Sequence, residues 1–145
     1  MTPEAVYWHL WTDEDGVTHQ TRCQFKGFAI EAFSPPSPPL AIDRLKMKAS
    51  SVVVSILPPG LEADWHKNPR SQWIIPLSGR WYVESMDGTR IEMGPGEISF
   101  GEDQTARPDT DNRVGHLSGT VGNEPAVLLV VQIDDDPTTG NPGRF

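Results

Sequence analysis

Two histidines and a glutamine are the residues of this chain best suited to chemistry. His66 and Gln72 lie within a stretch bounded by Gly60 and Gly79 that contains two apolar, β-like runs, and His116 opens a later run. A neutral imidazole can bind a metal or accept a proton near neutral pH, and an amide can orient a ligand. Inside a β-barrel, such side chains must be carried on strands whose other residues form the wall.

The composition predicts one all-β domain. A chain of 145 residues can bury most of its apolar surface without disulfides or a structural metal. Its 14 prolines and 13 glycines favour many short elements over a few long helices. No 3.6-residue apolar period runs for three turns, so we expect short strands packed as a sandwich or barrel.

The charge and the cysteine content exclude several classes of partner and compartment. A net charge of −8 and a pI near 4.8 argue against binding to nucleic acid or to an anionic membrane surface. The single cysteine, Cys23, cannot form an internal disulfide and is typical of a reducing compartment. The sequence shows no signal peptide and no apolar run of membrane-spanning length, so a cytoplasmic protein is expected.

We divide the single domain, residues 1–145, into four segments by composition. An N-terminal hairpin is expected in residues 1–33, because aromatic and apolar runs flank the turn cluster TDEDG. Prolines make 34–41 a stiff connector. The barrel core spans 42–133, and 134–145 reads as a mostly solvated tail.

Within the core, RLKMKAS at 44–50 is expected to be a polar edge strand, with Lys46 and Lys48 blunting the edge. The β-branched run at 51–57 predicts a strand, and the most apolar run, at 126–133, predicts another.

Strand alternation predicts where neighbouring side chains point. If Gln72 faces the barrel interior, Ile74 faces it too, and Trp73 points outward to pack on a second layer or a subunit partner. Glu102 and Asp103 are adjacent at a strand end, so they are expected to point to opposite sides, and only one of them can face the barrel.

The stretch Gly60–Gly79 resembles the first motif of cupins, which are small antiparallel jelly-roll β-barrels. That motif reads Gly, five residues, His-x-His, three or four residues, Glu, six residues, Gly. His66 matches the first histidine, Asn68 replaces the second, and Gln72 replaces the glutamate. The turn at 95–97, Pro-Gly-Glu before ISFG, resembles the start of the second motif. The resemblance implies a site in the mouth of a jelly-roll barrel.

The histidine of the second motif has two candidate positions. Counted literally from the turn, its place falls on Arg107. The order Glu-Asp at 102–103, a longer loop and then His116 resembles a set of single-domain bacterial cupins that also carry Pro-Arg-x-Gln, as residues 69–72 do here. In that alignment His116 takes the histidine's place.

The resemblance implies a divalent metal as one reading of the site. His66, Gln72 and His116 would then hold one Fe, Mn, Ni or Zn ion, with Glu102 or Asp103 as the nearest source of a carboxylate. Two imidazoles and an amide form a poor cage, because cupin metals usually take a carboxylate as well.

A metal-free site is the other reading. His66 or His116 would act as the catalytic base or simply bind a ligand, and Arg70, Gln72, Glu102 and Arg107 are the ligand-binding candidates.

The expected function is the binding of a small molecule in the barrel mouth. The resemblance implies a metal-assisted oxygenase or an isomerase acting on a small polar or carboxylated compound. The alternative is a metabolite-binding or sensor protein without metal or catalysis. The family and the aromatic run AVYWHLW at 5–11 also predict a homodimer.

Overall fold

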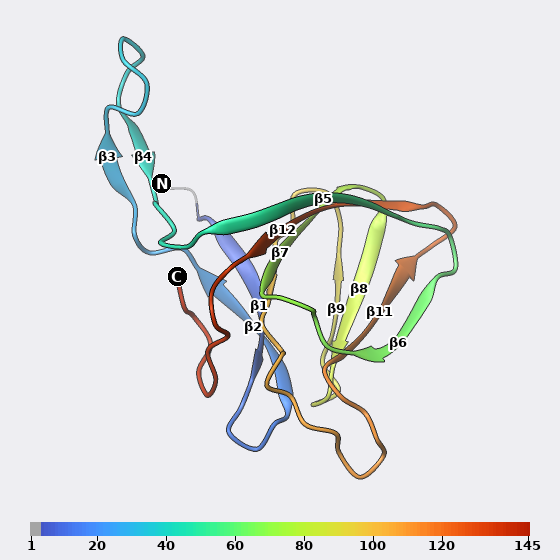
Figure 1. The fold of residues 1–145 in the computed structure, drawn as a ribbon. Helices are drawn as coiled ribbons and strands as arrows, with labels where there is room; N and C mark the ends of the chain where they lie inside the picture. Colours follow the sequence, from blue (N-terminus) through green and yellow to red (C-terminus); the bar gives the residue numbers. More distant parts are fainter. Residues whose placement is uncertain (1–3) are drawn as a thin grey trace.

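The computed structural model describes residues 4–145, which form twelve β-strands and no helix. Residues 1–3, the start of the predicted N-terminal segment, lie outside the described residues. Ten strands build two facing sheets, and the other two form an arm that projects from them (Figure 1). No helix in residues 4–145 is long and apolar enough to cross a membrane.

The larger sheet has six strands in the order β2-β1-β10-β7-β12-β5. Its neighbours are antiparallel except for β1 and β10, which run parallel. The strands are β1 (Val6–Thr12), β2 (Thr18–Gln24), β5 (Ala49–Leu57), β7 (Gln72–Ser78), β10 (Ser99–Gly101) and β12 (Ala126–Ile133).

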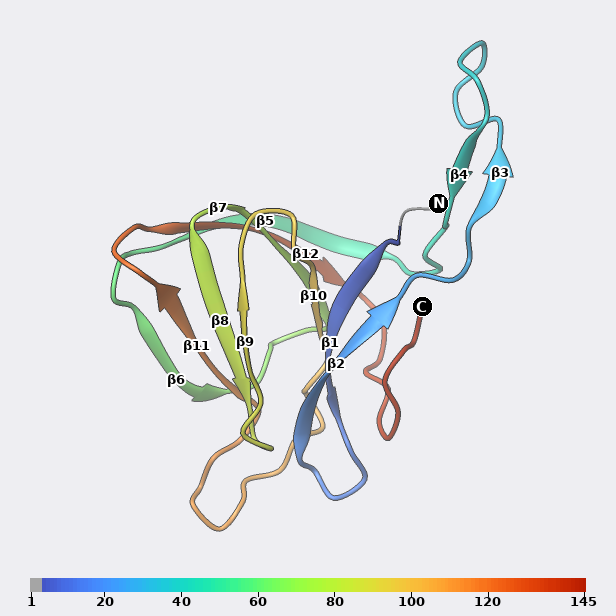
Figure 2. The same ribbon diagram turned by 180° about the vertical axis from the view of Figure 1, so that it is seen from behind.

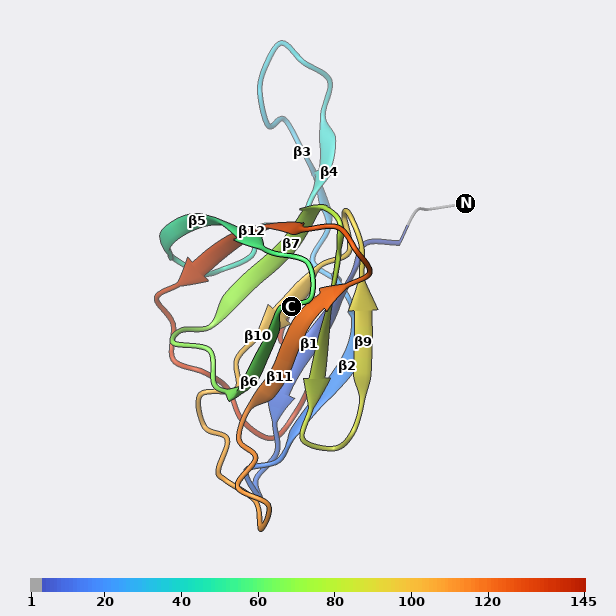
Figure 3. The ribbon, with the colours of Figure 1, turned by 90° about the vertical axis from the view of Figure 1, so that its right-hand side faces the viewer.

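The smaller sheet has four strands in the order β6-β11-β8-β9, all antiparallel. They are β6 (Glu62–His66), β8 (Arg80–Ser85), β9 (Arg90–Met93) and β11 (His116–Val121). The two sheets enclose the core without closing into one continuous barrel (Figure 3). The predicted all-β fold is confirmed, with one parallel strand pair where an antiparallel arrangement was expected.

The main core lies between the sheets. Alternate residues of β7, β8 and β12 point inward, as expected for strands that are buried on one face. Ile74 is among them, as the alternation from Gln72 predicted. The buried residues are Leu10, Ile74, Trp81, Val83, Met93, Ala126, Leu128 and Val130.

A second core covers part of the outer face of the six-stranded sheet. Trp73 points outward, as predicted, and packs at 5.5 Å from Tyr7 and 4.6 Å from Phe100, measured between ring centroids. Leu45 and Met47 cover this cluster from the segment that precedes β5. Leu45 and Met47 are partly buried against this cluster, and residues 43–48 pair with no strand, contrary to the prediction of an edge strand there. The edge of the sheet is β5 itself.

The arm consists of β3 (Ala29–Glu31) and β4 (Leu40–Ile42), which pair with each other. The proline-rich residues 34–39 form its tip rather than a connector across the barrel (Figures 1 and 2). Most arm side chains are exposed, so the arm makes little contact with the domain that carries it.

The last residues are anchored to the sheet, although many of them are exposed. Glu102 is fully buried and accepts hydrogen bonds from Thr138 and Arg144, and the backbone N–H of Gly143 donates to His9 Nδ1. Burial by itself would raise the pKa of Glu102, but the hydrogen bonds from His9 and Thr138 outweigh it and hold the pKa below its ordinary value. A buried ionic cluster therefore fixes the segment predicted to be a solvated tail.

The aromatic run of the N-terminal hairpin is largely used inside its own chain. Tyr7, His9 and Leu10 are buried in β1. These three side chains are therefore not available to pack across a two-fold axis, as the expected homodimer would have required of this run.

Candidate functional site

A small cavity lies between the two sheets, at the place the cupin-like motif indicated. Its volume is about 230 Å³, and strands of both sheets contribute to its wall. The predicted site residues His66, Gln72 and His116 all line it. The rest of the lining is chiefly apolar, from Leu57, Leu61, Ala63, Ile74, Leu128 and Val130.

The two histidines come together because their strands pair. His66 ends β6 and His116 begins β11, and the two residues are cross-strand partners. Their ring centroids lie 4.3 Å apart with the ring planes at 53°. His66 and His116 are fifty residues apart in the sequence, but strand pairing brings their rings into contact at the rim of the cavity.

Gly115 makes this approach possible. Its φ of +79° is in the left-handed region, and an added Cβ would collide with the backbone oxygen of His66. Any side chain at this position would push β6 and β11 apart just where the two rings meet.

We expect Gly115→Ala to lower the free energy of unfolding by roughly 3 kcal/mol, because it adds a collision to the cost of a left-handed φ. Gly122→Ala is the matched control, since Gly122 has a φ of +82° but open space around it. That control should lose only about 1 kcal/mol. Urea unfolding measures both, and equal losses would contradict this account of Gly115.

His116 is held by a buried carboxylate. Its Nδ1 lies 2.7 Å from Oδ2 of Asp103, and Oδ1 of Asp103 accepts the backbone N–H of Asn68 at 2.9 Å. Asp103 is fully buried. Because an ionised carboxylate only accepts hydrogen bonds, Nδ1 carries the proton, and Nε2 of the neutral ring keeps its lone pair.

His66 is oriented in the same way by a backbone group. Its Nδ1 lies 2.6 Å from the carbonyl oxygen of Asp64, which can only accept. The proton therefore sits on Nδ1 here too, and both neutral rings have Nε2 as their free acceptor.

Three amides form a chain along one wall of the cavity. Gln72 Nε2 donates to Asn68 Oδ1 at 2.9 Å, and Gln132 Nε2 donates to Gln72 Oε1 at 3.1 Å. Gln132 is in turn held by the Ser51 hydroxyl at 2.7 Å. The chain fixes the orientation of Gln72, whose oxygen already has a protein donor.

Trp81 contributes a buried donor without a partner. Its side chain lines the cavity, and its indole Nε1–H makes no hydrogen bond within residues 4–145. A buried N–H without an acceptor is costly, so this donor marks a place where a small rearrangement of the wall could offer a hydrogen bond to a ligand.

The remaining predicted ligand-binding residues lie away from the cavity. Arg70 is exposed and pairs with Asp134 at 3.3 Å, and Arg107 donates to the backbone oxygen of Glu14 on the surface. Glu102 points to the opposite side from Asp103, as adjacent strand residues must, and holds the C-terminal segment. Of the two candidate positions for the second-motif histidine, His116 lines the cavity and Arg107 does not.

The donors around the cavity do not fit a resident metal ion. Residues 4–145 contain no group of three His, Cys, Asp or Glu side chains arranged to hold one. His66 and His116 offer two nitrogens, Asp103 is engaged by His116 and Asn68, and the Gln72 oxygen is engaged by Gln132. A first-row metal needs at least one more strong protein donor, so no step below is assigned to a metal.

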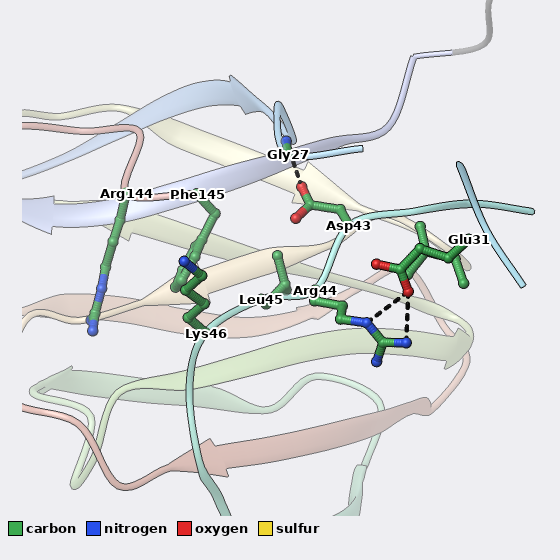
Figure 4. A pocket seen from close by; sticks show the side chains of 9 residues that line it. Gly27, Glu31, Asp43, Arg44, Leu45, Lys46, Arg144 and Phe145 are labelled. Carbon is green, nitrogen blue, oxygen red and sulfur yellow. Dashed lines mark hydrogen bonds and ion pairs between the residues drawn. The ribbon is translucent and has the colours of Figure 1, made fainter. Parts of the chain in front are cut away.

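A larger hollow, of about 590 Å³, lies at the root of the arm (Figure 4). It contains none of the predicted site residues. Arg44 and Arg144 face it, but both are paired, with Glu31 and with Glu102 and Asp135 respectively. The smaller cavity is the better candidate, because it brings together His66, Gln72 and His116.

Three residues of the site carried little or no sequence signal. Asp103 was named only as one of two possible carboxylates, and its contact with His116 is visible only in three dimensions. Trp81 reads as a core residue, since its free N–H is visible only in three dimensions. Gln132 had a usable signal, because it is the one amide in the apolar run at 126–133.

Comparison with solved structures finds similar folds. A cupin-domain structure from Bordetella pertussis Tohama I has a TM-score of 0.43 and 21% sequence identity, and the match covers 65% of this chain and 88% of that chain. A structure from Neisseria meningitidis has a TM-score of 0.42 and 13% identity, with 64% and 88% covered. No family model and no curated protein matches the chain. The similarity is to a cupin-like fold and does not extend to a reaction.

Proposed function

We propose that the cavity binds a small molecule with an apolar body and a carboxyl or carbonyl head, and that His116 takes a proton from it. The observation that carries this proposal is the buried Asp103–His116 pair on the wall of a cavity that Trp81 also lines, and the buried indole N–H of Trp81 has no partner within residues 4–145. The apolar lining suits the body of the ligand, and the indole N–H suits its oxygen.

The proposed chemistry is proton transfer next to a carbonyl group. His116 Nε2 accepts the proton as the C–H bond breaks, and the electron pair moves to the carbonyl oxygen. Trp81 N–H stabilises the negative charge that develops on that oxygen. Return of the proton to a different carbon or face completes an isomerisation, and His66 is a second imidazole that can deliver it.

Binding can be tested with acetate, isobutyrate and benzoate, detected by NMR. We expect the Trp81 indole N–H resonance to shift on titration, and Trp81→Phe to weaken binding about fivefold through the loss of one hydrogen bond. Trp11→Phe is the control, because Trp11 Nε1 already donates to Thr21. The absence of any shift with all three carboxylates would rule out the proposed head group.

Proton transfer can be tested separately with pyruvate in D₂O. A competent base should exchange the methyl protons of pyruvate for deuterium faster than buffer does, and His116→Ala should abolish the excess rate. Binding without exchange would favour the second candidate function, a metabolite-binding or sensor protein. That candidate draws support from the lining, since Leu57, Ile74 and Leu128 serve binding and not chemistry.

A further inference from the structure

The outer face of three neighbouring strands of the six-stranded sheet is a continuous apolar surface. The register sets Val54 of β5 beside Leu129 of β12, and Leu129 beside Ile75 of β7. In the neighbouring rows, Val52 lies beside Val131 and Ile56 lies beside Val127. Together the outward side chains are Val52, Val54, Ile56, Val127, Leu129, Val131, Ile75 and Leu77, hereafter the outer apolar face.

This surface is only partly covered by its own chain. The second core buries the end near Trp73, whereas Val52, Val54 and Ile56 remain 61–68% exposed. The opposite face of the same strands lines the cavity, through Leu57, Leu128 and others. Strands that are apolar on both sides are typical of sheets covered on both sides, so β5 and β12 carry the pattern of a surface that has a partner.

The arm carries a second apolar surface without a partner. Phe28, Ile30, Phe33 and Leu40 are 49–74% exposed, on a two-stranded hairpin of the kind that is marginally stable alone. The arm rises beyond the sheet on the side of β5, and it does not fold back onto the outer apolar face (Figures 1 and 2). The hollow at its root separates it from its own domain.

We propose that a second copy of this chain covers these surfaces, with the arm of each copy lying on the outer apolar face of the other about a two-fold axis. Within one chain, the arm does not reach the outer apolar face. In a two-fold dimer, the arm of each copy can cover the outer apolar face of the other copy. None of the outward side chains is charged, which suits the association of two chains that each carry a net charge of −8.

The exposed area is sufficient for a stable dimer. All nine large apolar side chains that are exposed within residues 4–145 lie on the arm, β5 or β7. Eight of them, all except Val53, whose side chain points to the inner face of β5, belong to the arm or to the outer apolar face. At roughly 100 Å² each, about half the area of a large side chain, these eight present on the order of 800 Å², which matches the roughly 800 Å² per partner of a standard interface. The free edge of β5 would be shielded in the same contact.

Light scattering of the full chain tests the proposal. The wild-type mass should be that of a dimer, and both Ile30→Asp and Val54→Asp should shift it to a monomer while Thr110→Asp, on an exposed loop, leaves it unchanged. Circular dichroism checks that the variants are folded. Ile30 contacts little of its own domain, so its substitution can be interpreted even if Val54→Asp unfolds the chain.

Cross-linking tests which surfaces meet. Chains carrying Ile30→Cys and chains carrying Val54→Cys, both with Cys23→Ser, are mixed and treated with a flexible bismaleimide. A covalent heterodimer is expected, and pairing Ile30→Cys with Thr110→Cys should give none. A monomeric wild type, or a dimer that survives both aspartate substitutions, would overturn the proposal whether or not the cavity binds carboxylates.

Discussion

Replacing Glu102 by glutamine is expected to lower the free energy of unfolding by about 3–5 kcal/mol, the usual cost of breaking a buried ionic cluster. Every contact to the Glu102 carboxylate comes from a group that donates to it, on His9, Thr138 and Arg144. A glutamine would place an N–H₂ against two of these donors. His9 cannot compensate by changing tautomer, because its Nδ1 already accepts the N–H of Gly143.

Urea unfolding at neutral pH measures the loss. Asp134→Asn is the control: Asp134 lies in the same C-terminal segment but pairs with Arg70 in an exposed position, so it should cost less than about 1 kcal/mol. Hydrogen exchange should show residues 138–145 opening in Glu102→Gln and not in Asp134→Asn. Similar losses for the two variants would contradict the anchoring role of Glu102.

The same cluster should make stability sensitive to acid. The folded pKa of Glu102 is below its ordinary value of 4.5, so its contribution is complete above that pH and is lost as the pH falls through the folded pKa. The stability of Glu102→Gln should therefore decline less steeply below about pH 4.5 than that of the wild type.

The fold could be predicted well wherever strand pattern and turn chemistry agree. The runs at 51–57 and 126–133 became β5 and β12, and the alternation that starts at Gln72 placed Trp73 and Ile74 on opposite faces. These predictions depend on local rules, because a strand's period and its turns are set by neighbouring residues. The spacing of His66 and Gln72 within Gly60–Gly79 is also a local pattern, and both residues line the cavity.

One predicted strand did not form, and the largely exposed C-terminal segment is anchored at a few points, because of contacts between residues that are distant in sequence. Residues 44–48 look like an edge strand, yet Leu45 and Met47 are drawn into the aromatic cluster around Trp73. The C-terminal segment looks solvated, yet Arg144 reaches a carboxylate 42 positions away. Neither partner can be inferred from the local sequence, since both contacts require the sheet to be formed first.

The sequence pointed to the two histidines of the cavity but not to the groups that orient them, the Asp103 carboxylate and the Asp64 carbonyl. His66 could be named from motif spacing and His116 from the resemblance to single-domain cupins with a longer loop, but the sequence could not tell which of the two adjacent acids contacts His116. Alternation limits the choice to one of Glu102 and Asp103, and only the direction of β10 decides it. The structure assigns Asp103 to His116 and Glu102 to the opposite face.

Asp103→Asn should invert the tautomer of His116 while preserving the fold. The side-chain oxygen of the new asparagine should accept the backbone N–H of Asn68, as Oδ1 of Asp103 does. The reverse orientation would place the amide NH₂ against this N–H, and two donors cannot form a hydrogen bond. The amide nitrogen then faces His116 Nδ1 and donates to it, so the ring proton moves to Nε2. His116 would present a donor to the cavity where the wild type presents a base, and excess deuterium exchange into pyruvate should fall by roughly 10³- to 10⁴-fold, or to the buffer rate.

Nitrogen-15 shifts of the imidazole rings report the tautomer directly and need no substrate. In Asp103→Asn, Nε2 of His116 should change from an unprotonated to a protonated shift, and His66 should not change because the carbonyl of Asp64 holds it. Asp64→Asn is the matched control, since only the backbone of Asp64 contacts His66. An unprotonated Nε2 in Asp103→Asn would show that Asp103 does not set the tautomer, and the catalytic part of the proposed function would lose its physical basis.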